Sequence, residues 1–249
     1  SYEAKAYPQV GRCQYWPLDE GSGTEATDVW NGGVAQLAGN AVYEGGKFHS
    51  GVRLNGGHLS FPSGWASGWK DFSLSLWVRP ERVENWARIV DCNRGTDNNF
   101  FLTVQAAQTG FLRYAITQGG NSDEQQINTN FKMKAGAWTH IVLTQKGSTG
   151  ILYANGVEVG RNENLTLSPS SLGATTQNFI GRSAYASDPS LFGWVDDVRV
   201  YDCALDAGQV SALYGAATQA SLLGSWRNAK WAMRLSRLRY PPLPVFPWL

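Results

Sequence analysis

Residues 72–79, Phe-Ser-Leu-Ser-Leu-Trp-Val-Arg, alternate strictly between two faces of an extended chain. One face receives Phe72, Leu74, Leu76 and Val78, which predicts a strand with its apolar side buried. Pro80 follows and should end it. Comparable runs predict further strands at 12–18, 51–61, 86–92, 99–105, 111–117, 138–145, 176–182 and 193–201.

Asn155-Gly156 stands between two β-rich runs, and this pair favours a two-residue hairpin because both of its residues tolerate positive φ. The other predicted strands recur at hairpin spacing. We therefore expect an all-β protein, built as two antiparallel sheets in a jelly-roll sandwich.

A short C-terminal helix is predicted near the end of this domain. Asp206 can cap it, Gln209 completes a capping box, and Gly215 should stop it. We place the domain at 1–217 and a basic, Trp- and Pro-rich tail at 218–249. Four basic residues of the tail share a helical stripe, but apolar residues flank both sides of it, so a linker, an out-of-frame end or a loosely docked tail is favoured over a dedicated binding helix.

Charge separates the tail from the body of the chain. All 20 acidic residues precede residue 220, which leaves the body with a net charge of −4. Such a body gives no reason to expect nucleic acid as a partner. No apolar run approaches the ~20 residues that a membrane-spanning helix needs, so no membrane span is expected.

Catalytic groups are not indicated. A retaining glycosidase needs two carboxyl groups about 5 to 5.5 Å apart in one cleft, and the sequence lacks the Glu-x-Asp-x-x-Glu strand that would supply them. Asp196 and Asp197 are adjacent, so in a regular strand their side chains leave opposite faces. The three histidines have no Gly-x-Ser-x-Gly elbow as a partner. We therefore expect this chain not to be an enzyme.

Six segments, in order along the chain, carry a family resemblance. They are Tyr15–Asp28, Phe72–Pro80, Trp138–Thr144, Leu152–Gly156, Ile180-Gly-Arg182 and Gly193–Tyr201 with the Ala204-Leu205 that follows. Together these segments resemble the bacterial laminin-G-like family, over roughly residues 10–215. The resemblance implies a concanavalin A-like jelly roll. It also implies a carbohydrate-binding or adhesion module of a secreted protein, commonly appended to a glycoside hydrolase and often holding a structural calcium.

Calcium takes a mixture of carboxylates and carbonyls, which the glycine-rich stretch 18–33 offers. In the resembling family the first and last strands lie side by side, which would bring the last strand to this loop. The expected ligands are Glu20, Asp28, one of Asp196 and Asp197, and carbonyl groups near Asn31. The alternative is that these carboxylates are tied to backbone N–H groups or to Arg199.

The same adjacency of first and last strands would bring Cys13 near Cys203. We expect a disulfide between them, as suits a secreted protein, with Cys92 left as a buried thiol. The alternative is three small core residues.

Sugar binding requires exposed aromatic rings with polar groups beside them. Trp65 and Trp69 lie in a Gly/Ser-rich loop and are the expected exposed rings, whereas Trp16, Trp77 and Trp138 lie in strands and should be packed. Further candidates are Trp86, Arg94, Asp97 and Asn98, on either side of the strand predicted near 86–92, and Tyr185 and Asp188 in the loop before the last strand.

The expected function is a non-catalytic carbohydrate-binding module of a secreted polysaccharide-active protein, which targets an attached enzyme to a polysaccharide or oligosaccharide. The alternative is a structural interaction domain that packs on a neighbouring catalytic domain and binds no sugar.

Overall fold

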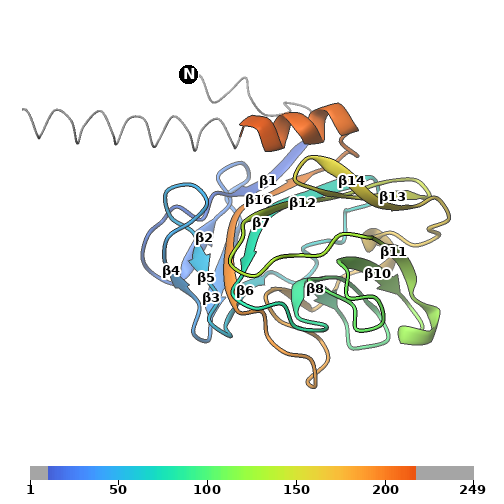
Figure 1. Ribbon diagram of the computed structural model, residues 1–249, viewed down its shortest axis with the longest axis horizontal. Coiled ribbons are helices and arrows are strands. Elements are labelled where there is room, and N and C mark those ends of the chain that lie inside the picture. The colour runs from blue at the N-terminus through green and yellow to red at the C-terminus, as the bar shows by residue number, and fades with distance from the viewer. Residues whose placement is uncertain (1–10, 217–249) are drawn as a thin grey trace, which may run out of the picture.

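The computed structural model describes residues 11–216, which form two antiparallel sheets packed face to face, with a helix at the C-terminal end (Figure 1). The predicted all-β sandwich is confirmed. The predicted tail, 218–249, lies outside the described residues. Among residues 11–216 no helix is long and apolar enough to span a membrane.

The first sheet, here called the β7 sheet, has eight strands in the described chain, with the order β14-β13-β12-β7-β16-β5-β4 and β1 also paired with β16. Their bounds are β1 Arg12–Trp16, β4 Val42–Tyr43, β5 Val52–Arg53, β7 Phe72–Pro80, β12 Thr139–Lys146, β13 Thr149–Ala154, β14 Val157–Asn162 and β16 Gly193–Tyr201.

The second sheet, here called the β8 sheet, also has eight described strands, in the order β11-β10-β9-β8-β15-β6-β3-β2. Their bounds are β2 Glu25–Thr27, β3 Val34–Ala38, β6 His58–Phe61, β8 Arg88–Asn93, β9 Asn99–Thr103, β10 Arg113–Thr117, β11 Gln125–Asn128 and β15 Gln177–Ile180. Two short 3₁₀ turns, Asn121–Asp123 and Pro169–Leu172, lie in loops.

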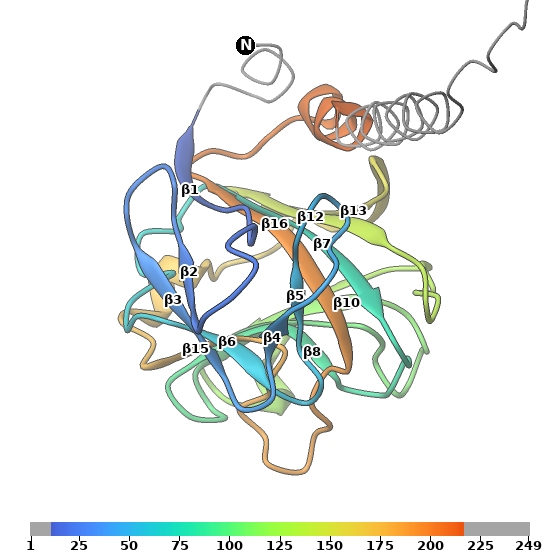
Figure 2. The same ribbon diagram turned by 90° about the vertical axis from the view of Figure 1, so that its left-hand side faces the viewer.

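The core lies between the two sheets (Figure 2). Phe72, Leu74, Leu76 and Val78 face into it, as the alternation along β7 predicts. Residues 51–61 do not form one strand: the chain turns at Asn55 and Gly56, which have φ of 47° and 79°, so β5 joins one sheet and β6 the other.

The C-terminal helix, 207–216, covers the outer face of the β7 sheet. Its capping box forms as predicted. The backbone N–H of Gln209 donates to Asp206 Oδ1 at 2.8 Å, and the backbone N–H of Asp206 donates to Gln209 Oε1 at 2.9 Å. Gly215 does not stop the helix, which is still helical at 216. The helix packs through a second apolar cluster, Val142, Tyr153, Tyr201, Leu205, Val210 and Leu213.

The hairpin between β13 and β14 is confirmed. Ala154 pairs with Val157, and Asn155 and Gly156 have φ of 52° and 81°. Positive φ at both central residues matches the right-handed twist of the flanking strands, which is why Asn-Gly suits this turn.

The seam between β1 and β16 differs from the prediction at its cysteines. Arg12 pairs with Tyr201 and Gln14 with Val200, with a bulge between these pairs that shifts the register. Cys13 packs against the core between the sheets, whereas Cys203 packs against the cluster under the helix. Both are free thiols, as is the buried Cys92, so the predicted Cys13–Cys203 disulfide is absent from this structure.

Candidate functional site

The outer face of the β8 sheet carries a row of polar side chains. Cross-strand pairs link Arg88 to Thr103, Thr103 to Arg113 and Arg113 to Asn128, across β8, β9, β10 and β11. Residues directly opposite one another in antiparallel strands project from the same face. Arg88, Thr103 and Arg113 are nevertheless buried, whereas Asn128 is exposed. We call these four residues the polar row.

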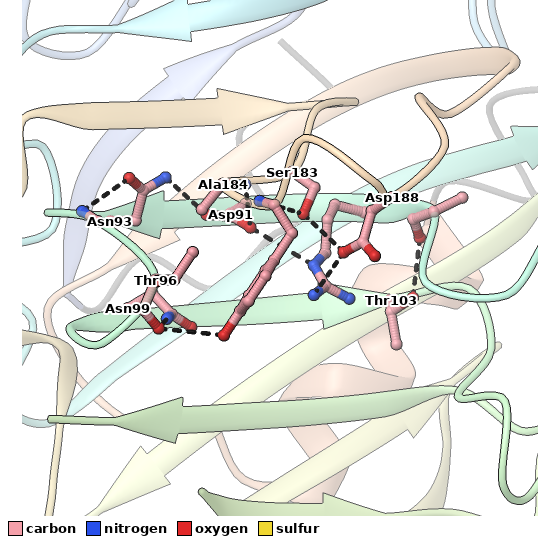
Figure 3. A network of polar contacts seen from close by, with 12 residues as sticks. Asp91, Asn93, Thr96, Asn99, Thr103, Ser183, Ala184 and Asp188 are labelled. Atoms are coloured by element: carbon pink, nitrogen blue, oxygen red, sulfur yellow. Dashed lines mark hydrogen bonds and ion pairs between the residues drawn. The ribbon is translucent and has the colours of Figure 1, made fainter. Parts of the chain in front are cut away.

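Arg88 is the centre of a buried network beneath this face (Figure 3). Its Nε lies 3.4 Å from Asp91 Oδ2, its Nη2 lies 3.0 Å from Asp188 Oδ2, and its side chain is 3% exposed. The guanidinium carbon also lies 3.7 Å from the centre of the Phe101 ring. These contacts fix Arg88 in one position.

The two carboxylates have further partners. Asp91 accepts hydrogen bonds from the Asn93 side chain at 2.8 Å and from the Ala184 backbone at 3.0 Å. Asp188 accepts one from the Ser183 hydroxyl at 2.8 Å. Residues 183–188 are thereby tied to β8, although they lie far away in the sequence.

Burial dominates the electrostatics of this network. It raises the pKa of Asp91, against the opposing effects of its hydrogen bonds and of Arg88, and it lowers the pKa of Arg88, against Asp91 and Asp188. Arg88 Nη1 is buried and has no hydrogen-bond partner in the described part of the chain. A buried donor without an acceptor is costly, and its burial keeps this atom out of direct reach of a ligand in the described structure.

Two aromatic residues flank the network. The half-buried Trp86 ring lies 5.6 Å from the Arg88 guanidinium and 5.7 Å from that of Arg113. Its φ is 66°, a strained conformation for a bulky residue and one that often marks a functional position. The Tyr185 hydroxyl donates to the Thr96 carbonyl at 3.1 Å, so its half-buried ring spans from residues 183–188 to the β8–β9 turn.

Three of the predicted sugar-binding residues, Trp86, Tyr185 and Asp188, thus meet around Arg88. Arg94, Asp97 and Asn98 lie in the β8–β9 turn, where the Arg94 amide donates to the Asn98 carbonyl at 2.8 Å. This turn includes Thr96, the partner of Tyr185. The structure therefore groups three of the six residues around Arg88 and places the other three in the turn that Tyr185 reaches.

Trp65 and Trp69 do not belong to this group, and the exposure predicted for them is wrong. They are 7% and 5% exposed and lie in the core. Trp65 stacks on Phe61 with ring centres 3.8 Å apart, and its Nε1 donates to Gln14 at 3.0 Å. The Gly- and Ser-rich loop folds inward, so its indoles close one end of the sandwich.

The residue types alone did not single out Arg88, Asp91 or Arg113. The signal that could have found them is a charged side chain inside an otherwise apolar strand, as at Arg88 and Asp91 of β8. A buried charge needs a partner, so such positions predict a network on one face of the sheet.

The five predicted calcium ligands are not brought to one point. Asp28 Oδ1 accepts hydrogen bonds from the backbone N–H groups of Tyr15, Trp30 and Asn31. Asp197 pairs with Arg199 at 2.7 Å, and Glu20 accepts from the Thr27 amide at 2.7 Å. Asp28 and Asp197 thus have the partners that the alternative interpretation assigned to such carboxylates. Within residues 11–216, no three His, Cys, Asp or Glu residues are grouped as a metal site.

Two members of this set, Asp28 and Asp196, each have one buried carboxylate oxygen without a hydrogen-bond partner among the described residues, Oδ2 of Asp28 and Oδ1 of Asp196. The other oxygen of Asp196, Oδ2, accepts a hydrogen bond from the Phe48 backbone N–H at 2.9 Å. Burial, together with the charges of Asp197 and Asp19, raises the pKa of Asp196 to about 9. The Asp19 carboxylate accepts from the Ser50 amide of the same loop at 3.1 Å. A cation near Asp196 Oδ1 would offset this cost.

Solved structures with the same fold were found at low sequence identity. Domain 4 of AbnA, an extracellular GH43 arabinanase from Geobacillus stearothermophilus, in complex with arabinotriose, is 22% identical, with a TM-score of 0.72 over 83% of this chain and 100% of that chain. A Trypanosoma rangeli sialidase in complex with the inhibitor DANA is 16% identical, with a TM-score of 0.61 over 83% of this chain and 33% of that one. The binding domain of botulinum neurotoxin serotype D/C is 14% identical, with a TM-score of 0.66 over 83% and 52%.

At these identities the likeness establishes the fold. This chain matches about a third of the length of the sialidase and about half of the length of the neurotoxin binding domain. No curated protein matches the chain. A family model does match, over residues 50–211, which is more than half of the sequence. The chain belongs to the concanavalin A-like lectin/glucanases superfamily.

Proposed function

We propose that this domain binds extracellular glycans without catalysis, on the outer face of the β8 sheet, and directs an attached polysaccharide-active enzyme of a secreted protein to them. The observation that carries the proposal is the Arg88 network. It holds a buried arginine between two carboxylates, with the rings of Trp86 and Tyr185 beside it.

The chemistry of this face suits a neutral sugar. Aromatic rings can stack on the apolar face of a sugar ring, and fixed polar groups can bond its hydroxyls. The carboxylates of Asp91, Asp188 and Glu124 act on Arg88 and offset the positive charge of this face. The matched arabinanase domain is in complex with arabinotriose, a neutral oligosaccharide, which supports the same class of ligand.

The two carboxylates beside Arg88 are poorly suited to catalysis. A general acid or base must exchange its proton with a substrate, whereas Asp91 and Asp188 are both held by Arg88 and by further donors. The geometry therefore favours binding over hydrolysis.

A second candidate function is a structural interaction domain that packs on a neighbouring catalytic domain. The observation in its favour lies on the β7 sheet, where the Arg79 guanidinium is 3.9 Å from the Trp194 ring and 5.4 Å from the Trp138 ring. Both indoles are half-buried. Tryptophan and arginine are enriched where protein surfaces meet.

Affinity electrophoresis against arabinan, xylan, galactan and laminarin separates the two. We expect at least one polysaccharide to retard the wild-type protein, and Trp86→Ala to abolish the retardation. Trp194→Ala is the matched control, because it removes a half-buried indole from the other sheet, and it should still be retarded. Retardation by none of the four, together with tight association of a catalytic domain that Trp194→Ala weakens, would favour the second candidate.

Structural calcium remains part of the proposal, in a narrower form than the sequence predicted. Asp196 and Asp19 would hold the ion, since Asp196 Oδ1 is buried without a partner and both carboxylates contact the loop around residues 48–50. Calcium would neutralise charge at this loop and hold it against β16.

A further inference from the structure

A hollow of about 420 Å³ lies beyond the edge of the β8 sheet, next to the end of the polar row. Its lining residues are Gln126, Asn128, Arg161, Asn162, Glu163 and Asn164. The first two are on β11 and the others belong to β14 or follow it. The Asn162 side chain donates to the Gln126 carbonyl at 2.8 Å, which joins the two sheets at this point.

A chain of hydrogen bonds connects the Arg88 region to this hollow. Arg113 Nε donates to Asn128 Oδ1 at 2.7 Å, Asn128 Nδ2 donates to Gln126 Oε1 at 3.2 Å, and Gln126 Nε2 donates to Glu124 Oε2 at 2.8 Å. The exposed amide of Asn128 therefore belongs both to the polar row and to the wall of the hollow. Arg113 itself lies beside Trp86, so polar contacts continue from the aromatic ring to the hollow.

The span is larger than one sugar. Neighbouring strands of a sheet lie about 4.8 Å apart, so the three steps from β8 to β11 cover roughly 14 Å before the hollow begins. A ligand that touches both ends must therefore be an oligomer.

The charged side chains of the hollow are paired with one another, and one arginine faces two carboxylates, as at Arg88. Arg161 donates to Glu158 at 2.7 and 2.8 Å and to Glu163 at 3.0 Å. Among the lining residues these internal pairs leave carboxamides as the polar groups for a ligand. Carboxamides offer both a donor and an acceptor, which matches hydroxyl groups better than phosphate, sulfate or uronate.

We propose that the domain binds an extended, uncharged oligosaccharide, which runs from Trp86 over the polar row, contacts its exposed member Asn128, and enters the hollow at Asn164. This inference rests on the proposed function and adds the length and charge class of the ligand. A chain of about three sugars would occupy only the part of this path near Trp86 and Arg88. A longer chain would also contact the residues of the hollow.

The test compares oligomers of three and six sugars, cut from whichever of the four polysaccharides retards the protein, by isothermal titration calorimetry. We expect the six-sugar oligomer to bind at least tenfold more tightly. Asn164→Trp should fill the hollow and remove this advantage, while affinity for the three-sugar oligomer stays within twofold. Asn164 suits the substitution because its side chain is exposed and the hydrogen bond it makes in the described structure uses its backbone N–H.

Asn40→Trp is the matched control, because it places the same ring on an exposed Asn in the turn after β3, towards the opposite edge of the β8 sheet. It should change neither affinity. Equal affinity for the two oligomers, or an equal loss of both in Asn164→Trp, would overturn the inference and leave glycan binding intact. Retardation by none of the four polysaccharides would instead overturn the proposed function, and the inference with it.

Discussion

Arg88 on β8 and Asp188 in the loop before β16 form an ion pair, with 3.0 Å between Nη2 and Oδ2 and with both side chains largely buried. This pair holds residues 183–188, and with them Tyr185, against the β8 sheet. The position of the loop therefore depends on a charge supplied by a distant strand.

Asp188→Asn should weaken both folding and glycan binding. The amide keeps the shape of the side chain but loses the charge that faces Arg88, and a hydrogen bond to a charged group contributes about 2 kcal/mol. Urea unfolding should show a loss of this size, and affinity for the polysaccharide that binds should fall. Ser187→Ala, an exposed change in the same loop, is the control and should alter neither. Unchanged stability of Asp188→Asn would contradict the assigned role of the pair.

Trp69→Leu should reduce stability without reducing sugar affinity. Trp69 is 5% exposed and packs against Phe72 and Trp65, with ring centres 5.3 and 4.9 Å away. Replacing it leaves a partial cavity, which we expect to cost about 3 kcal/mol. Denaturant unfolding and titration of the folded variant measure the two quantities. A folded variant of normal stability that had lost its affinity would restore Trp69 as a sugar contact.

Acidification should destabilise the protein through His140. Burial lowers the pKa of this imidazole to about 4, from an ordinary value of 6.5. Between these two pH values the imidazole is protonated in the unfolded chain and neutral in the folded chain. The stability that the neutral His140 contributes is fully present above pH 6.5 and is lost as the pH drops towards 4, by about 3 kcal/mol in all. His140→Phe keeps a ring beside Trp77 and Tyr214 but cannot titrate, so the stability of the wild-type protein relative to this variant should fall over this range. Parallel pH profiles of the two proteins would contradict this assignment.

Calcium should raise the melting temperature of the wild-type protein, and EGTA should lower it again. Asp196→Asn removes the charge of the proposed ligand, so its melting temperature should respond to neither. Glu20→Gln is the matched control, because Glu20 bonds to the Thr27 amide and not to the loop around residues 48–50, and it should keep the full response. No response in the wild-type protein, with no metal found by elemental analysis, would exclude the calcium proposal.

The strands were predictable because alternation depends on neighbouring residues. The face of β7 that holds Phe72 and Leu74, the Asn155-Gly156 hairpin and the Asp206–Gln209 capping box are all settled within a few residues. Their physical causes are local, so the sequence carries them directly.

The remaining features depend on distant partners. The β1–β16 register places Gln14 opposite Val200, and the bulge then places Arg12 opposite Tyr201, so Cys13 does not pair with Cys203, which counting along the chain could not anticipate. The burial of Trp65 depends on Phe61 and Gln14. Arg88 belongs to the candidate site because it forms an ion pair with Asp188, a contact between distant segments that the sequence does not indicate. Trp86, Tyr185 and Asp188 could be predicted as candidates, but their common contact with Arg88 could not.

The contacts of Arg88 also bear on the thermodynamics of ligand capture. A free arginine side chain loses about 2 kcal/mol of rotamer entropy when a ligand immobilises it. Arg88 has already lost that freedom on folding, because Asp91, Asp188 and Phe101 hold it from three directions. The rings of Trp86 and Tyr185 beside it therefore rest on a preorganised side chain, and most of the ordering that opposes glycan binding falls on the sugar chain itself.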